Sequence, residues 1–267
     1  MPIRVLGPAQ VVGPDGATRA LERKSRELLT VLALRAPAAV GVDELAELLW
    51  DDPPPSATKT LQAHVSRLRS ALAEATDGAV EVARSGPAYA LRAPEDELDV
   101  AVVARERDEG RSLFAAGRAD DAAAVLRRAR AQWRGEIELP TTTGATAMAA
   151  RWSQEHRQLV DEHLAAIVAG SAPGDAVPEL HALTAADPLR EPAWAMLVTA
   201  LHRSGQHAAS LRTFQAAREA LAEVGLEPGV ALRRTSCSAR RSATPGSSPT
   251  SASASRAAWK VRREAAC

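Results

Sequence analysis

The sequence predicts a mainly α-helical protein with a small β component, in which a small sheet, three helices and a hairpin precede an all-α repeat domain. Two observations support this. Short alternating runs and short amphipathic helices fill the first 93 residues, whereas longer helical repeats joined at glycines fill residues 98–235. We therefore expect one domain over residues 1–93 and a second over residues 98–235, followed by a tail over residues 236–267.

Three short runs that alternate apolar and polar residues open the chain, at residues 3–6, 10–12 and 18–21. They flank the turn-forming triplet Pro14, Asp15, Gly16. Alternation of this kind is typical of strands that bury one face. The sequence therefore predicts a small N-terminal sheet.

Two helices follow, and each is opened by a residue that favours a helix N-cap. Ser25 precedes a run rich in leucine and valine, and Asp43 precedes a shorter helix that extends to Trp50. The run Asp51, Asp52, Pro53, Pro54, Pro55 ends the second helix, because proline cannot continue it. We expect Ser56 to cap a third helix.

This third helix, over residues 56–74, has one apolar and one polar face. At about 100° per residue, its large aliphatic residues fall within a sector of roughly 60° and form a core stripe; they are Leu61, Val65, Leu68 and Leu72. The remaining surface mixes cations with hydrogen-bonding groups, which suits DNA phosphates and base edges. We expect DNA contacts from Lys59, Thr60, Gln62, Ser66, Arg67 and Arg69. Taken alone, the pattern also fits an ordinary solvated face, but the elements around it favour DNA binding.

A hairpin is predicted after this helix by two alternating runs at residues 80–83 and 89–92. Its tip carries Arg84. A hairpin that follows a helix suited to the major groove is a wing, so we expect Arg84 to reach the minor groove or the DNA backbone. Tyr89 is expected to anchor the wing to the body of the domain.

Helical periodicity dominates residues 98–235. Helices are expected over residues 99–116, 119–133, 146–169, 175–186, 191–203 and 207–223. In the last pair, large residues on the first helix and small ones on the second follow tetratricopeptide spacing, at Trp194, Leu197, Leu201, Gly205, Phe214 and Ala217. Such repeats provide surfaces for binding proteins or for dimerisation.

The formal net charge of zero hides an uneven distribution. Residues 1–93 carry 11 basic and 11 acidic side chains, residues 94–235 carry 16 and 21, and residues 236–267 carry 6 and 1. Because the N-terminal domain is not globally basic, its DNA affinity has to come from a local face formed by Lys59, Arg67, Arg69 and Arg84. No apolar run approaches the roughly 20 residues that cross a membrane, and we expect a cytoplasmic protein.

Motifs for catalysis are weak, and we expect neither an enzyme nor a bound cofactor or metal. Glu155, His156, Glu162 and His163 repeat at seven residues, but the HExxH order is absent and no third ligand is spaced to join them. A GxxxxGK[ST] phosphate loop is also absent. The two cysteines, Cys237 and Cys267, lie in the tail, so neither domain relies on a disulfide.

Several phrases, in this order, resemble a known regulator family. The segment HVSRLRSAL, residues 64–72, is similar to the HIxxLRxKL signature of the OmpR and PhoB winged-helix domains, and this resemblance covers residues 1 to about 93. The later phrases AVLRRARAQWRG, DPLREPAWAMLVTALHRSGQHAASLRTF and LEPG resemble the bacterial transcriptional activation domain. Their pairing resembles the Streptomyces antibiotic regulatory protein family, in a short form without a receiver domain or an ATPase module.

This resemblance implies a DNA-binding transcriptional activator that regulates a secondary-metabolite gene cluster. It also implies direct repeats as binding sites, homo-oligomers on DNA and recruitment of RNA polymerase. The acidic, proline-stiffened loop at residues 51–55 corresponds to the segment with which such activators contact polymerase, and it suits a basic sigma-factor region. The alternative is a tetratricopeptide-like adaptor without specific DNA binding, which predicts no salt-dependent DNA affinity.

The tail departs from the resemblance after LEPGVALRR. Eight of its 32 residues are serine, and large apolar residues nearly vanish, so we expect disorder. It is either a basic arm that adds nonspecific DNA affinity or a divergent or frameshifted end without a selected role, and the sequence does not separate the two.

Overall fold

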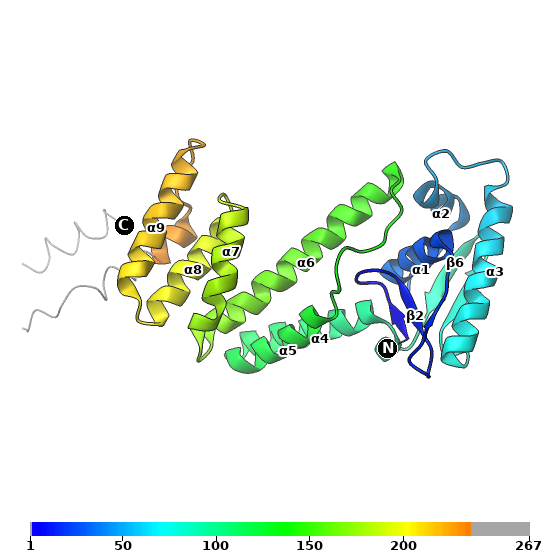
Figure 1. Ribbon diagram of the computed structural model, residues 1–267, viewed down its shortest axis with the longest axis horizontal. Coiled ribbons are helices and arrows are strands. Elements are labelled where there is room, and N and C mark those ends of the chain that lie inside the picture. The colour runs from blue at the N-terminus through cyan, green and yellow to red at the C-terminus, as the bar shows by residue number, and fades with distance from the viewer. Residues whose placement is uncertain (1, 236–267) are drawn as a thin grey trace, which may run out of the picture. The chain divides into compact units, whose positions relative to one another are not determined.

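The computed structural model describes residues 2–235, which fall into two compact units (Figure 1). The first unit comprises Met1–Ala116 and Ala124–Val160, and the second comprises Gly117–Ala123 and Asp161–Cys267. The fold class predicted from the sequence is confirmed. The predicted tail, with both cysteines, lies outside the described residues. Within residues 2–235, no helix is long and apolar enough to span a bilayer.

The N-terminal part of the first unit contains two small antiparallel sheets and three helices. In chain order its elements are β1 (Ile3–Arg4), β2 (Gln10–Val12), β3 (Thr18–Arg19), α1 (Arg23–Arg35), β4 (Val40–Gly41), α2 (Val42–Leu49), α3 (Ala57–Thr76), β5 (Glu81–Ser85) and β6 (Ala88–Arg92). The first sheet has the order β1-β2-β3 and the second the order β4-β6-β5. This is the arrangement of a winged helix, with β5 and β6 as the wing.

The core of the winged helix forms around α1. This helix buries nearly its whole length, with Leu28, Leu29, Val31 and Leu32 all fully inaccessible to solvent. A helix that is apolar on most sides has to lie inside the domain, and α1 packs against α2, α3 and β6. Figure 1 shows α3 along the outer edge of this unit, with β6 and α1 on its inner side. One face of α3 is therefore left to solvent.

Three local predictions need correction. Ser25 does not cap α1, which begins at Arg23; its side chain is buried instead. Asp43 does not cap α2, because that helix begins at Val42 and Gly41 is its N-cap. Ser56 does precede α3, but its side chain makes no capping hydrogen bond. A cap predicted from residue type depends on the path of the incoming chain, which tertiary contacts determine here.

The remaining named elements of the described chain are helices. They are η1 (Glu95–Glu97), α4 (Asp99–Ala115), α5 (Ala119–Ala131), α6 (Thr143–Ala169), η2 (Pro173–Ala176), α7 (Val177–Ala186), α8 (Glu191–Arg203) and α9 (His207–Ala222). Within the first unit, a Cβ on Gly110 of α4 would lie 2.6 Å from Cγ of Leu126 on α5. The two helices thus approach closely at a position that only glycine tolerates without a shift of Leu126.

The helix pair α8 and α9 forms the core of the second unit with the tetratricopeptide-like pattern predicted for it. Val198 on α8 packs with Phe214, Ala217 and Leu221 on α9. The hydroxyl of Ser210 donates to the carbonyl oxygen of Val198 at 2.9 Å. Residues 230–235 are helical and contribute the fully buried Leu232 to the same cluster.

Candidate DNA-binding face

The solvent face of α3 carries the residues predicted to read DNA. Leu61, Val65, Leu68 and Leu72 are buried, so the predicted core stripe is where the sequence places it. The opposite side is exposed at Lys59, Gln62, Ser66, Arg67 and Arg69 and half-buried at Thr60. Lys59 has no ion pair with any residue described in the structure, so its ammonium group is available to a phosphate.

Arg67 is paired with Glu22, which lies just before α1. One guanidinium nitrogen of Arg67 binds Oε2 of Glu22, and both side chains remain more than half exposed. In the absence of DNA, Glu22 is therefore paired with a side chain that is predicted to bind DNA. Sequence reasoning missed this pair, because its members lie 45 positions apart.

His64 lies behind this pair and is buried. Its Nδ1 lies 3.3 Å from the hydroxyl of Ser25 and 4.0 Å from Oε2 of Glu22. Burial, followed by the positive charge of Arg67, lowers the pKa of His64 below its usual 6.5. The neutral imidazole thus joins α3 to α1 beneath the exposed face.

Arg69 connects α3 to the wing. Its Nε donates to the carbonyl oxygen of Val82 on β5 at 2.8 Å, and its guanidinium carbon lies 5.9 Å from the ring centroid of Tyr89 on β6. Tyr89 is 4% exposed, in keeping with the anchoring role expected for it. Arg69 therefore holds the wing beside α3.

The wing is longer than the two predicted runs and closes in a tighter turn. Ser85 pairs directly with Ala88, so only Gly86 and Pro87 form the turn, with Gly86 at φ +58°. Arg84 near the tip donates from Nε to the carbonyl oxygen of Gly86 at 3.2 Å. Next to this turn, Ala88 and Tyr89 pair with β4, a strand of two residues that the sequence analysis missed.

The loop between α2 and α3, predicted to contact polymerase, is exposed from Asp51 to Pro55. Asp51 accepts a hydrogen bond through Oδ1 from the backbone N–H of Thr143, at 2.7 Å, where α6 begins. The carboxylate of Asp52 makes no hydrogen bond to any residue in the described part of the chain. In this loop Asp51 is therefore hydrogen-bonded, whereas Asp52 is exposed to solvent.

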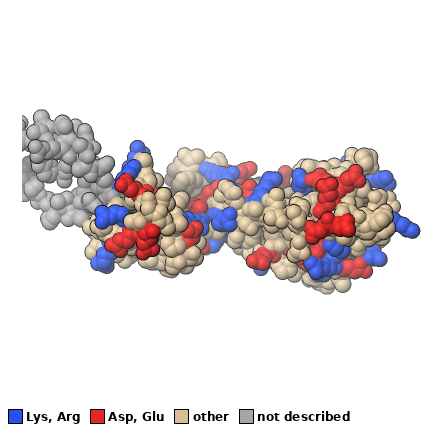
Figure 2. Space-filling view, turned by 90° about the horizontal axis from the view of Figure 1, so that it is seen from above, with Lys and Arg blue, Asp and Glu red and all other residues tan. Residues whose placement is uncertain are grey.

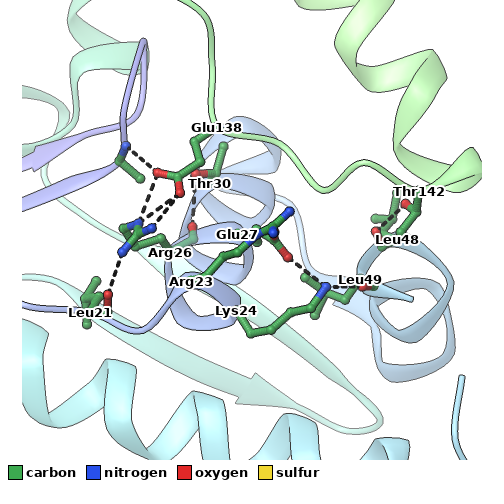
Figure 3. Close-up of polar contacts among 11 residues, drawn as sticks. Leu21, Arg23, Lys24, Arg26, Glu27, Thr30, Leu48, Leu49, Glu138 and Thr142 are labelled. Atoms are coloured by element: carbon green, nitrogen blue, oxygen red, sulfur yellow. Dashed lines mark hydrogen bonds and ion pairs between the residues drawn. The ribbon is translucent and has the colours of Figure 1, made fainter. Parts of the chain in front are cut away.

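Residues 134–142 bind the winged helix on the side that includes α1 and the end of α2 (Figure 3). The carboxylate of Glu138 accepts from Nε of Arg26 at 2.9 Å and from the backbone N–H of Ala9 at 3.2 Å. The hydroxyl of Thr142 donates to the carbonyl oxygen of Leu48 at 2.7 Å, which satisfies a C-terminal carbonyl of α2. The first unit is therefore bonded across the predicted domain boundary.

Acidic and basic side chains are interspersed over the winged helix on the face that Figure 2 shows. This view displays no single basic field.

The histidine and glutamate repeat on α6 is used for packing and ion pairing. Glu155 pairs with Arg107 of α4, while the ring of His156 stacks on Trp133 with centroids 4.7 Å apart. Across residues 2–235, no three histidine, cysteine, aspartate or glutamate side chains lie together as metal ligands.

Comparison with known families agrees with this geometry. The model of the bacterial transcriptional activator domain matches residues 98–238, more than half of the chain. The chain belongs to this family. A second model, that of the C-terminal domain of transcriptional regulatory proteins, matches residues 16–87. The two matches, in this order, confirm the predicted membership of the Streptomyces antibiotic regulatory protein family.

Relatives within the family extend over most of this chain. It is 30% identical to the regulatory protein DnrI of Streptomyces peucetius, over 87% of this chain and 89% of DnrI. It is 32% identical to the transcriptional regulatory protein EmbR of Mycobacterium tuberculosis over 86% of this chain, but it spans only 60% of EmbR. The structure of EmbR in complex with a low affinity phosphopeptide superimposes with a TM-score of 0.80 and 26% identity, covering 98% of this chain and 69% of that one.

Proposed function

We propose that this chain is a promoter-binding transcriptional activator that inserts α3 into the DNA major groove, with the wing on the adjacent minor groove or backbone. The observation that carries the proposal is the exposed polar face of α3 above a fully buried aliphatic stripe, beside a wing held in place by Arg69. Lys59, Arg67 and Arg84 supply cations for phosphates, while Thr60, Gln62 and Ser66 supply hydrogen bonds to base edges.

The target of the proposed activator is a secondary-metabolite gene cluster, and family membership supports that assignment. Two copies bind head to tail on direct repeats about one helical turn apart, because that spacing keeps both winged helices on one side of the duplex. The exposed loop over residues 51–55 then faces a basic region of the polymerase sigma factor. These steps take place in the cytoplasm and require no enzymatic activity.

The proposal is tested with the full chain on DNA. Genome-wide mapping identifies the binding sites, and a footprinting titration then measures affinity at several salt concentrations. We expect a steep loss of affinity as salt rises, and an Arg67→Ala protein that binds at least about tenfold more weakly. Arg118→Ala is the matched control, because Arg118 is an exposed arginine of the second unit that pairs only locally with Asp121.

Direct repeats are tested separately by insertion of about half a helical turn, roughly 5 base pairs, between the two half-sites. Cooperative binding should be lost. Unchanged cooperativity would indicate a symmetric dimer on a palindrome, and salt-independent affinity would indicate the adaptor function instead.

A further inference from the structure

A pocket of about 620 Å³ lies between the segment after α5 and α6, and none of its lining residues belongs to α3 or the wing. It is lined on one side by Trp133, residues 135–137 and Leu139, and on the other by Trp152, His156 and Arg157. Its volume falls in the roughly 300–1,000 Å³ range of small-molecule sites. All of its lining residues belong to the first unit.

Aromatic rings are concentrated at this pocket in a chain that has few of them. Aromatic residues make up 3% of the sequence, yet two of the five tryptophans line this one pocket. The centroids of Trp133 and Trp152 lie 6.4 Å apart with a tilt of 46°, and His156 stacks on Trp133 at 15°. Both tryptophans remain only half-buried. Rings in this arrangement offer a surface on which a flat ring can stack.

Two charged groups at the pocket have no partner among the residues that the structure describes. Arg157 and Glu136 both line it, and neither makes an ion pair or a side-chain hydrogen bond with any residue between 2 and 235. A guanidinium binds a carboxylate through two parallel hydrogen bonds. A carboxylate such as Glu136 accepts a hydrogen bond from a hydroxyl group.

The wall formed by residues 135–139 is held in place from outside the pocket. Before it, the backbone N–H of Arg134 donates to the carbonyl oxygen of Leu6 at 2.8 Å. At Glu138, the carboxylate is fixed by Arg26 and the backbone of Ala9. A ligand would therefore meet a wall that is already ordered, which reduces the entropic cost of binding.

We propose that this pocket binds a flat aromatic small molecule that carries a carboxylate and a hydroxyl group. The ring stacks on Trp152 beside the stacked pair of Trp133 and His156, the carboxylate pairs with Arg157, and the hydroxyl donates to Glu136. This binding does not depend on the DNA-binding function proposed above.

The test uses the full chain without DNA and 6-hydroxy-2-naphthoate as the ligand, with 2-naphthol as the analogue that lacks the carboxylate. Binding is followed by the NMR signals of the tryptophan indole N–H groups, each assigned by a Trp→Phe substitution. We expect saturable binding with a Kd on the order of 1 mM or tighter, which shifts the signals of Trp133 and Trp152 but not those of Trp50 and Trp194.

Variants separate the aromatic and the ionic contributions. Trp152→Ala should weaken binding of both compounds about tenfold or more. Arg157→Gln should weaken the naphthoate about fivefold or more and leave 2-naphthol unchanged. Arg151→Gln is the matched control, because it removes an exposed arginine of α6 that does not line the pocket. Absence of saturation, shifts at all tryptophans alike, or equal affinity of Arg157→Gln and wild type would overturn the proposal.

Discussion

At the residue scale, the side chains of the proposed DNA-binding face on α3 differ in the contacts they make in the absence of DNA. The three cations of this polar face differ: Lys59 has no ion pair among the described residues, Arg67 is paired with Glu22, and Arg69 holds the wing. Their contributions to DNA affinity should differ accordingly.

Glu22→Gln should increase the affinity for DNA. The substitution releases Arg67 from its ion pair and removes a negative charge that DNA phosphates would meet. An exposed pair of this kind contributes roughly 0.2–1 kcal/mol, so we expect binding about two- to fivefold tighter in a fluorescence anisotropy titration. Asp121→Asn, which breaks the exposed pair with Arg118 in the second unit, is the control and should leave the affinity unchanged. A weaker complex with Glu22→Gln would show that Glu22 positions Arg67 productively.

His64 should make the free energy of unfolding depend on pH. Its folded pKa lies below its usual 6.5, so the unfolded chain binds more protons in the window between the two values. Stability therefore rises with pH through that window and is lost as the pH falls through it. Glu22, Lys24, Glu27 and Arg67 are the charged groups that act on this imidazole.

Urea unfolding of wild type and His64→Asn at pH values from about 7.5 to about 5.5 measures this effect. We expect a smaller loss of stability on acidification in the variant. His181→Asn, an exposed histidine of α7, should behave like wild type. Parallel pH profiles for wild type and His64→Asn would contradict the assignment.

At the element scale, the wing is held beside α3 by several hydrogen bonds acting together. The hydrogen bond from Arg69 joins α3 to β5, and β4 joins the chain before α2 to β6. The N–H of Val42 also donates to the carbonyl oxygen of Pro87 at the turn of the wing, at 2.9 Å. A two-stranded hairpin alone would be marginal in water, so these contacts are what hold the wing in place.

Arg69→Ala should lower the free energy of unfolding by about 1–2 kcal/mol, because it removes a charge-assisted hydrogen bond to a backbone carbonyl. Lys59→Ala should change stability by less than about 0.5 kcal/mol, because Lys59 has no ion pair within residues 2–235 to lose. Chemical denaturation of both variants gives the comparison, and hydrogen exchange should show reduced protection in β5 for Arg69→Ala. Equal stability of the two variants would place Arg69 with the purely DNA-binding residues.

At the scale of the whole first unit, the winged helix and the segment before α6 are bonded into one body. Glu138 bridges α1 and the turn at Ala9, Thr142 caps α2, and the buried carboxylate of Asp99 accepts from the backbone N–H groups of Val5 and Leu6 at 2.7 and 2.8 Å. Burial raises the pKa of Asp99, against the lowering effect of these hydrogen bonds. The family model that begins at residue 98 thus starts one residue before Asp99, whose carboxylate binds the backbone just after β1.

Glu138→Gln should destabilise this unit by about 1–2 kcal/mol, because it removes the charge that binds Arg26 and weakens the hydrogen bond to Ala9. Glu136→Gln is a matched control two residues away and should change stability by less than about 0.5 kcal/mol. Thermal or urea unfolding measures both. If the two variants unfold alike, the contact seen between Glu138 and Arg26 contributes nothing measurable to the fold.

The sequence by itself determined the elements whose signal is local. The aliphatic stripe on α3 and the limits of α8 follow from helical periodicity over a few turns, and the wing follows from two alternating runs around a glycine. Short sequence motifs spread along the chain identified the family for the same reason, because each can be recognised without knowledge of the fold.

Only the tertiary structure decided what depends on distant partners. The pairing of Arg67 with Glu22, the two-residue strand β4 and the pocket between Trp133 and Trp152 join positions that share no local pattern. Helix starts at Arg23 and Val42 were also missed, because the approach of neighbouring elements fixed them and not the nearest capping residue. Periodicity shows which face of an element is buried. Which residues cover that face, and which bind its polar side, depends on contacts between distant parts of the chain that form only on folding.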